Sequence, residues 1–291
     1  MDVRNILEPA PKVADGKYLE AIWDLQKQLL EGYIGKIEKD LPMYPIDIHS
    51  FEGQQVLKDF SARVIEETAE GYESTTYALD LVKKYGYNLQ ALNEVEFDML
   101  LNHLQNSNEE QADATAFFVC LLLYANIDIQ DIYDYANKKF GDNKSITKFD
   151  SLKSLMALGY FLHDKQSYVM DQQNMFPILT DDALEDFNKD VEHVRSYIPA
   201  FTKACDESHR MEDHMLWSVA YHINISRNFL KNKPWKQTQE LTDVTRYAEQ
   251  VVLGFIKYLG YLAAVGFTPE SLYVLFYKKH RVNEFRQTSG Y

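Results

Sequence analysis

Two short motifs place carboxylates three residues apart in segments with helical patterning. Glu67 and Glu70 belong to ETAE, and Glu110 and Asp113 belong to EQAD. Residues three apart lie on the same side of an α-helix, so each motif would present two carboxylates on one face. Mg²⁺ prefers oxygen ligands in octahedral geometry and would remove the repulsion between these charges. All four residues are therefore candidate magnesium ligands.

Each motif taken alone also fits an ordinary helix surface. A stripe of glutamates is typical of a solvated helix face. The polar sequence QNSNEEQ leads into the second motif and predicts a break, followed by an apolar helix from Glu110 to Ala125. In the first turn of that helix, Glu110 and Asp113 would complement the helix dipole. Two facing helices that each donate two carboxylates would instead form a cage for divalent ions.

A cationic face near the C-terminus gives the acidic motifs a chemical counterpart. Lys279, Asn283 and Arg286 are spaced by four and three residues, which places two cations and an amide on one helical face. These groups suit the oxygens of a triphosphate, which arginine can bind through two parallel hydrogen bonds. The ordinary alternative is a solvated last helix whose basic residues complement its C-terminal dipole.

Five motifs, in this order, resemble those of a known enzyme family. The family comprises the dimeric all-α dUTPases of trypanosomatids and bacteria and the related phage dCTPase/dUTPases, which belong with the MazG-like pyrophosphatases. The last motif is the most specific, because its Lys, Asn, Arg, Gly and Tyr all fall at the family spacing. The five segments are LQKQLL (25–30), ETAE (67–70), EQAD (110–113), SRNFLKNKPWKQT (226–238) and KHRVNEFRQTSGY (279–291).

This resemblance implies a reaction and the residues that perform it. Water would attack the α-phosphorus of a nucleoside triphosphate and release a nucleoside monophosphate and pyrophosphate. Glu67, Glu70, Glu110 and Asp113 would hold two or three Mg²⁺ ions, for which Mn²⁺ could substitute, and Glu67 would also orient or deprotonate the water. The implied phosphate contacts are Lys279, Asn283, Arg286, Tyr291, Arg227, Lys231 and Lys236, and the implied base or sugar contacts are Gln26 and Phe117.

Departures from the family pattern leave the base open. Leu30 stands where trypanosomatid dUTPases have Asn, and Ala116 stands where several relatives have His. We expect dUTP as the first substrate, with dCTP or a modified pyrimidine nucleotide as alternatives. The stretch between Glu70 and Glu110 is longer than in relatives, which predicts an insertion at a helical hairpin. A hypothesis of another class is a non-catalytic helical protein that keeps the fold to bind a nucleotide or a partner protein.

Helical periodicity extends along most of the chain, and no run of alternating strands or Gly-rich phosphate loop interrupts it. We predict an all-α fold with residues 1–291 in a single domain, and allow for a helical insertion around 146–210. The last helix should begin at Pro269, with Thr268 as its cap. The other predicted helices lie at about 17–41, 53–85, 88–108, 110–125, 126–145, 151–162, 181–197, 211–231 and 237–265.

Composition favours a soluble, intracellular protein over one that binds nucleic acid broadly or spans a membrane. The formal net charge of −14 argues against broad binding of nucleic acid, which requires basic surfaces. Cys120 and Cys205 are the only cysteines, which suggests a reducing compartment, and residues 1–16 lack the apolar core of a signal peptide. We expect a cytoplasmic location, that of the host if a phage encodes the chain. A homodimer is implied by the resemblance and by the apolar helix at 251–267, which needs partners on several sides.

Overall fold

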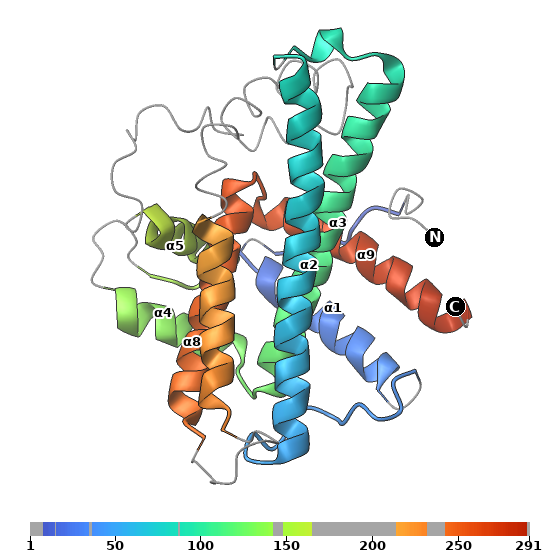
Figure 1. Ribbon diagram of the computed structural model, residues 1–291. Helices are drawn as coiled ribbons and strands as arrows, with labels where there is room; N and C mark the ends of the chain where they lie inside the picture. Colours follow the sequence, from blue (N-terminus) through green and yellow to red (C-terminus); the bar gives the residue numbers. More distant parts are fainter. Residues whose placement is uncertain are drawn as a thin grey trace.

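The computed structural model describes residues 8–14, 16–34, 37–86, 88–141, 148–164, 214–231 and 242–289. Within these ranges the regular elements are helices and there is no strand, which confirms the all-α prediction (Figure 1). The predicted site residues Lys236 and Tyr291 lie outside the described residues, and so does 165–213, most of the predicted insertion.

A long antiparallel pair, α2 (Phe51–Lys84) and α3 (Glu94–Tyr124), positions both acidic motifs. Helix α2 begins at the Ser50 cap, whose hydroxyl accepts a hydrogen bond from the Gly53 amide at 2.9 Å. Helix α3 begins at a capping box, in which Asn93 and Glu96 each accept a hydrogen bond from the other's backbone amide. Both acidic motifs therefore lie inside long helices.

The predicted break before the second motif was wrong, because α3 runs without interruption through QNSNEEQ. This segment contains no Gly or Pro, and two of its polar side chains, Ser107 and Gln105, form hydrogen bonds within the helix pair. The Ser107 hydroxyl bonds the Thr75 hydroxyl of α2 at 2.7 Å, and Gln105 donates to Glu109 at 2.9 Å. Asp113 therefore lies about five turns from the start of its helix. A helix-dipole role for this carboxylate is excluded, since that effect fades after the first turn.

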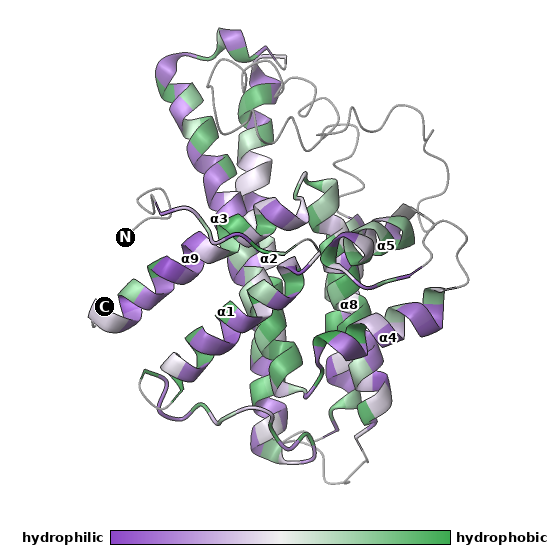
Figure 2. Ribbon diagram, turned by 180° about the vertical axis from the view of Figure 1, so that it is seen from behind, coloured by the Kyte–Doolittle hydropathy of each residue, from purple (hydrophilic) through white to green (hydrophobic). Residues whose placement is uncertain are grey.

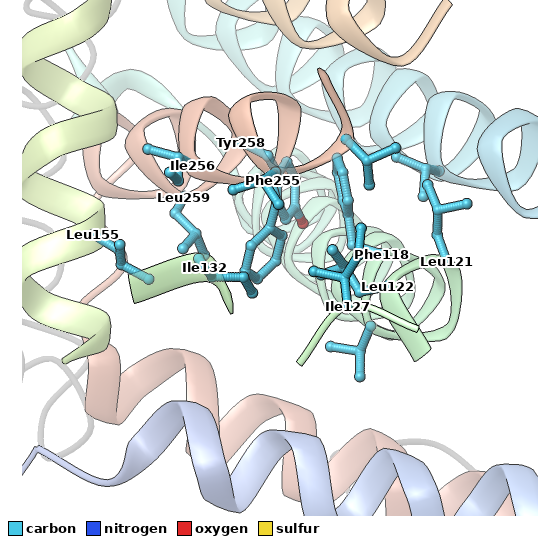
Figure 3. Close-up of a cluster of buried hydrophobic side chains, with 14 of the residues drawn as sticks. Phe118, Leu121, Leu122, Ile127, Ile132, Leu155, Phe255, Ile256, Tyr258 and Leu259 are labelled. Carbon is cyan, nitrogen blue, oxygen red and sulfur yellow. The ribbon is translucent and has the colours of Figure 1, made fainter. Parts of the chain in front are cut away.

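The principal core surrounds α8 (Val244–Ala264), which packs against α3, α4 (Ile129–Phe140) and α5 (Leu152–Asp164) (Figure 3). Phe118 of α3 stacks on Tyr258 of α8, with ring centroids 4.9 Å apart. Helices α5 and α8 touch through their backbones, because Gly159 and Gly260 face each other without a Cβ between them.

Helix α8 is largely buried within one chain, which removes one argument for a dimer. Residues 214–229 form a further helix along α8, where Ser218 accepts a hydrogen bond from Lys257 at 2.6 Å. Together with α3 and α5, this helix leaves most of α8 buried within one chain, and Figure 2 shows how strongly apolar α8 is. The homodimer then rests on the family resemblance alone.

Helices α1 (Tyr18–Tyr33) and α9 (Pro269–Ser289) lie side by side across the α2–α3 pair (Figure 1). The predicted start of α9 is confirmed, because the Ser271 amide donates to the Thr268 hydroxyl at 3.1 Å. The Gln287 side chain ties the end of α9 to α1 by donating to the Leu29 carbonyl at 3.3 Å. Helix α9 also packs against α3, which places its cationic face near that helix.

The α2–α3 hairpin extends well beyond the rest of the helices (Figure 1). Its far end has a small core of its own, made by Ala78, Val82, Leu89 and Leu100, and a short 3-10 helix, η2 (Leu89–Ala91), near the turn. This extension accounts for the long stretch between the two acidic motifs. Among the described residues, no single helix is long and apolar enough to cross a membrane, although two bent pairs, α3 with α4 and α8 with α9, meet that test together.

Candidate functional site

Three glutamates converge where α2 and α3 face each other. Glu67 and Glu70 of α2 and Glu110 of α3 each offer a carboxylate oxygen, and these oxygens lie within 4.8 Å of one another. The close approach of the helices is built into the sequence, because a side chain at Gly71 would overlap the Gln111 amide of α3. Glu67 and Glu110 are half-buried and Glu70 is exposed, so the cluster has a solvent-facing side.

This cluster retains a proton that isolated carboxylates would release. Burial raises the pKa of Glu67 from 4.5 to about 8, and the Asp113 charge and a hydrogen bond with Glu110 add to the effect. Burial also raises the pKa of Glu110. A hydrogen bond between two carboxyl groups requires a proton on one of them. The Glu67–Glu110 pair therefore shares a proton at the position where a cation would neutralise it.

Asp113 has a different partner, Lys279 of α9. The Lys279 ammonium lies 2.8 Å from Asp113 Oδ2 and 3.4 Å from Glu109 Oε2, and only 8% of the residue is exposed. Burial lowers the pKa of Lys279, but the charges of Asp113 and Glu109 outweigh burial and raise it, so the ammonium stays charged. Three helices thus meet at the site, and Asp113, the fourth predicted metal ligand, lies outside the cluster of three glutamates.

The rest of the α9 face continues from Lys279 toward solvent. Asn283 is half-buried and Arg286 is exposed, one and two turns further along the helix. The Arg286 charge is close enough to act on Asp113. The structure therefore brings all three predicted α9 residues to the acidic end of the site, with two of them accessible to an anionic ligand.

An aromatic layer lies next to the carboxylates. Phe117 of α3 and Phe60 of α2 have ring centroids 6.2 Å apart, and the Arg63 guanidinium lies 5.5 Å from the first and 5.6 Å from the second. Arg63 is fixed by Asp59 at 2.8 Å and by a weaker contact with Glu38 at 3.6 Å. Phe117 follows Asp113 by four residues, which is about 6 Å along the helix.

Gln26 of α1 lies close to this aromatic layer. Its side chain is 5% exposed and donates to the Cys120 thiol of α3 at 3.1 Å, whereas its carbonyl oxygen has no hydrogen-bond partner. Cys120 lies three residues beyond Phe117, and the positive charge of Arg63 is close enough to act on its thiol. A buried amide oxygen without a partner is costly, which makes it a candidate acceptor for a ligand.

Arg227 and Lys231, the described part of the fourth motif's basic cluster, lie away from the carboxylates. The Lys231 amide donates to the Thr242 hydroxyl at 3.4 Å, and Gln54 of α2 donates to the same hydroxyl at 2.7 Å. Gln54 precedes Glu67 by 13 residues, about 20 Å along α2. Arg227 donates to Asn224 on its own helix. The described residues thus separate Arg227 and Lys231 from the rest of the site.

Two residues at the site were absent from the sequence prediction. Glu109 shares Lys279 with Asp113, and its spacing of four from Asp113 was the signal that could have revealed it. Arg63 lies one turn before Glu67 on the same helix face and could have been found in the same way.

An open cavity of about 810 Å³ lies elsewhere, between the starts of α1 and α4, and is lined by none of the predicted site residues. Its charges largely neutralise one another, because Lys17 pairs with Glu20 at 3.1 Å and Lys148 pairs with Asp150 at 3.4 Å. The predicted carboxylates and the predicted α9 residues therefore lie at the α2–α3–α9 junction and not at this cavity.

Comparison with known proteins gives no match to this chain, whether with family models, with curated proteins or with solved structures. The family resemblance therefore remains a prediction that rests on the motifs themselves.

Proposed function

We propose that the chain is a Mg²⁺-dependent nucleoside triphosphate pyrophosphohydrolase that releases a nucleoside monophosphate and pyrophosphate. The observation that carries this proposal is the convergence of Glu67, Glu70 and Glu110 within 4.8 Å, beside the cationic face of α9. Carboxylate oxygens are the ligands that Mg²⁺ prefers. The raised pKa of Glu67 supports the fit, because burial and the neighbouring carboxylates disfavour its negative charge, and a bound cation would offset both effects.

Different residues of the site would bind the attacking water, the phosphates and the base. Bound Mg²⁺ would supply charge neutralisation and acidify a water. Glu67 orients the attacking water, while Lys279, Asn283 and Arg286 bind phosphate oxygens and hold the α-phosphorus in line with it. Phe117 lies one turn from Asp113, at a distance that suits a base attached to phosphates held at the carboxylates.

The Gln26 amide favours a pyrimidine as the base that binds at the aromatic layer. As oriented, its carbonyl oxygen could accept from the ring N–H of uracil or from the amino group of cytosine. Burial raises the pKa of Cys120 to about 12, so the thiol keeps its proton and could donate to the amide in its flipped orientation. The amide nitrogen would then donate to a base carbonyl. We propose dUTP as the first substrate and dCTP or a modified pyrimidine nucleotide as the alternative.

Pyrophosphate release in Mg²⁺, measured across the common ribo- and deoxyribonucleoside triphosphates, tests the proposal. We expect the highest kcat/KM for a pyrimidine deoxynucleotide. Glu70→Ala and Asp113→Ala should abolish turnover while circular dichroism shows unchanged helical content. Absence of turnover with every nucleotide would refute the enzyme and favour a non-catalytic binding protein, and an active Asp113→Ala variant would contradict the metal assignment.

A further inference from the structure

The two ends of the acidic site differ in whether a cation lies against the carboxylates. Among the described residues, the three clustered glutamates, Glu67, Glu70 and Glu110, have no ion-pair partner. Asp113 instead has the Lys279 ammonium at 2.8 Å. A metal ion at the first end meets no resident cation, whereas an ion at the second end meets the Lys279 ammonium.

We infer that Lys279 is an internal counter-ion that keeps the Asp113 end of the site closed to a metal ion until the phosphates of a nucleotide draw it away. This inference rests on the proposed function and adds an order of events to it. Lys279 is a positioning residue in the resting protein and a phosphate contact in the complex.

The geometry makes simultaneous occupation unfavourable. The ammonium contacts Asp113 Oδ2 and also Glu109 Oε2, and the other oxygen of Glu109 accepts a hydrogen bond from Gln105. An Mg²⁺ ion binds carboxylate oxygens at about 2.0–2.1 Å and would lie almost in contact with the ammonium. With so little of Lys279 exposed, water does not screen the repulsion between the two cations effectively.

The polar face of α9 offers a way for the Lys279 ammonium to leave Asp113. Asn283 and Arg286 follow Lys279 on the same face and extend from the buried ammonium to solvent. Phosphates that these residues bind would lie beside Lys279, whose three N–H donors can exchange carboxylate oxygens for phosphate oxygens by rotation of a flexible stem. Helix α9 need not move. The vacated Asp113 and Glu109 oxygens then become available to a second ion.

The experiment counts bound ions without requiring turnover. Mn²⁺ binding is measured by electron paramagnetic resonance and calorimetry on the wild type, Lys279→Met and the control Lys278→Met, with and without a nucleotide whose α,β-bridge is an imido group. We expect one Mn²⁺ per wild-type chain without nucleotide and at least one more with it. Lys279→Met should bind the additional ion without nucleotide, whereas Lys278→Met should match the wild type.

The outcomes separate the inference from the proposed function. Equal Mn²⁺ counts and affinities for the wild type and a folded Lys279→Met variant would overturn the counter-ion role, even in an active enzyme. If no Mn²⁺ binds the wild type under any condition, the metal centre and this inference both fail. If Lys279→Met does not fold, Lys279→Gln replaces it, since the amide keeps hydrogen bonds to Asp113 and Glu109 but removes the positive charge.

Discussion

Replacing Glu67 with glutamine should stabilise the metal-free protein while weakening its metal site. The glutamine amide can donate to Glu110 as the protonated carboxyl does, but it carries no charge to repel Asp113 or Glu70. Folded Glu67 keeps a proton that the unfolded chain releases above its ordinary pKa of 4.5. The free energy of unfolding of the wild type therefore falls as the pH rises from 4.5 to about 8.

The structure sets the size of this effect. The difference between 4.5 and about 8 would correspond to about 5 kcal/mol for a fully buried carboxyl. Since Glu67 is only half-buried, solvent screening reduces the expected gain to about 1–2 kcal/mol. In a chain of this length, that gain raises the melting temperature of Glu67→Gln by roughly 2–6 °C above pH 8.

Thermal and urea unfolding in EDTA, from pH 4 to 9, measure this gain. The difference between Glu67→Gln and the wild type should nearly disappear at pH 4, where Glu67 is protonated in the folded and in the unfolded chain. Added Mg²⁺ should stabilise the wild type at pH 8 and stabilise the variant much less. Glu66→Gln is the matched control, because Glu66 is exposed and lies outside the cluster. A gain that persists undiminished at pH 4, or that Glu66→Gln reproduces, would refute the shared-proton explanation.

Three further predictions test other parts of the structure. Phe117→Ala should raise KM for the preferred nucleotide by roughly tenfold, because a base loses its stacking surface, while Mn²⁺ binding stays unchanged in a direct titration. Gly159→Ala should lower the free energy of unfolding by about 1–3 kcal/mol in urea, since the new methyl group overlaps the Ile256 carbonyl; an unchanged midpoint would contradict the close packing of α5 on α8. Asn93→Ala should cost about 1 kcal/mol by removing the α3 cap, and equal stability would indicate that α3 begins elsewhere.

The local parts of the site could be predicted from the sequence because they depend on helical spacing alone. The three-residue spacing of Glu67 and Glu70 fixes their common face wherever the helix lies. The cap at Thr268 depends only on its neighbours, and the structure has it. These features need no knowledge of tertiary contacts.

Features that depend on a partner helix could not be predicted in this way. The polar stretch before Glu110 remains helical because Ser107 finds Thr75 across the α2–α3 interface, a contact that no local pattern reveals. Lys231 follows Arg227 at helical spacing in a basic motif. In the fold, its backbone amide bonds the Thr242 hydroxyl, which also accepts a hydrogen bond from Gln54 near the start of α2. Motif order along the chain does not determine distance in space.

The resting charges of the site have a thermodynamic consequence for the proposed enzyme. A proton on the Glu67–Glu110 pair and the ammonium of Lys279 together hold positive charge where the metal ions would bind. If nucleotide phosphates remove Lys279 from Asp113, they raise metal affinity, and linkage requires that metal raise nucleotide affinity by the same factor. The ions and the triphosphate should therefore bind as a mutually dependent set. An acidic chain gains from this arrangement, because its carboxylates would otherwise repel the anionic substrate in the absence of metal.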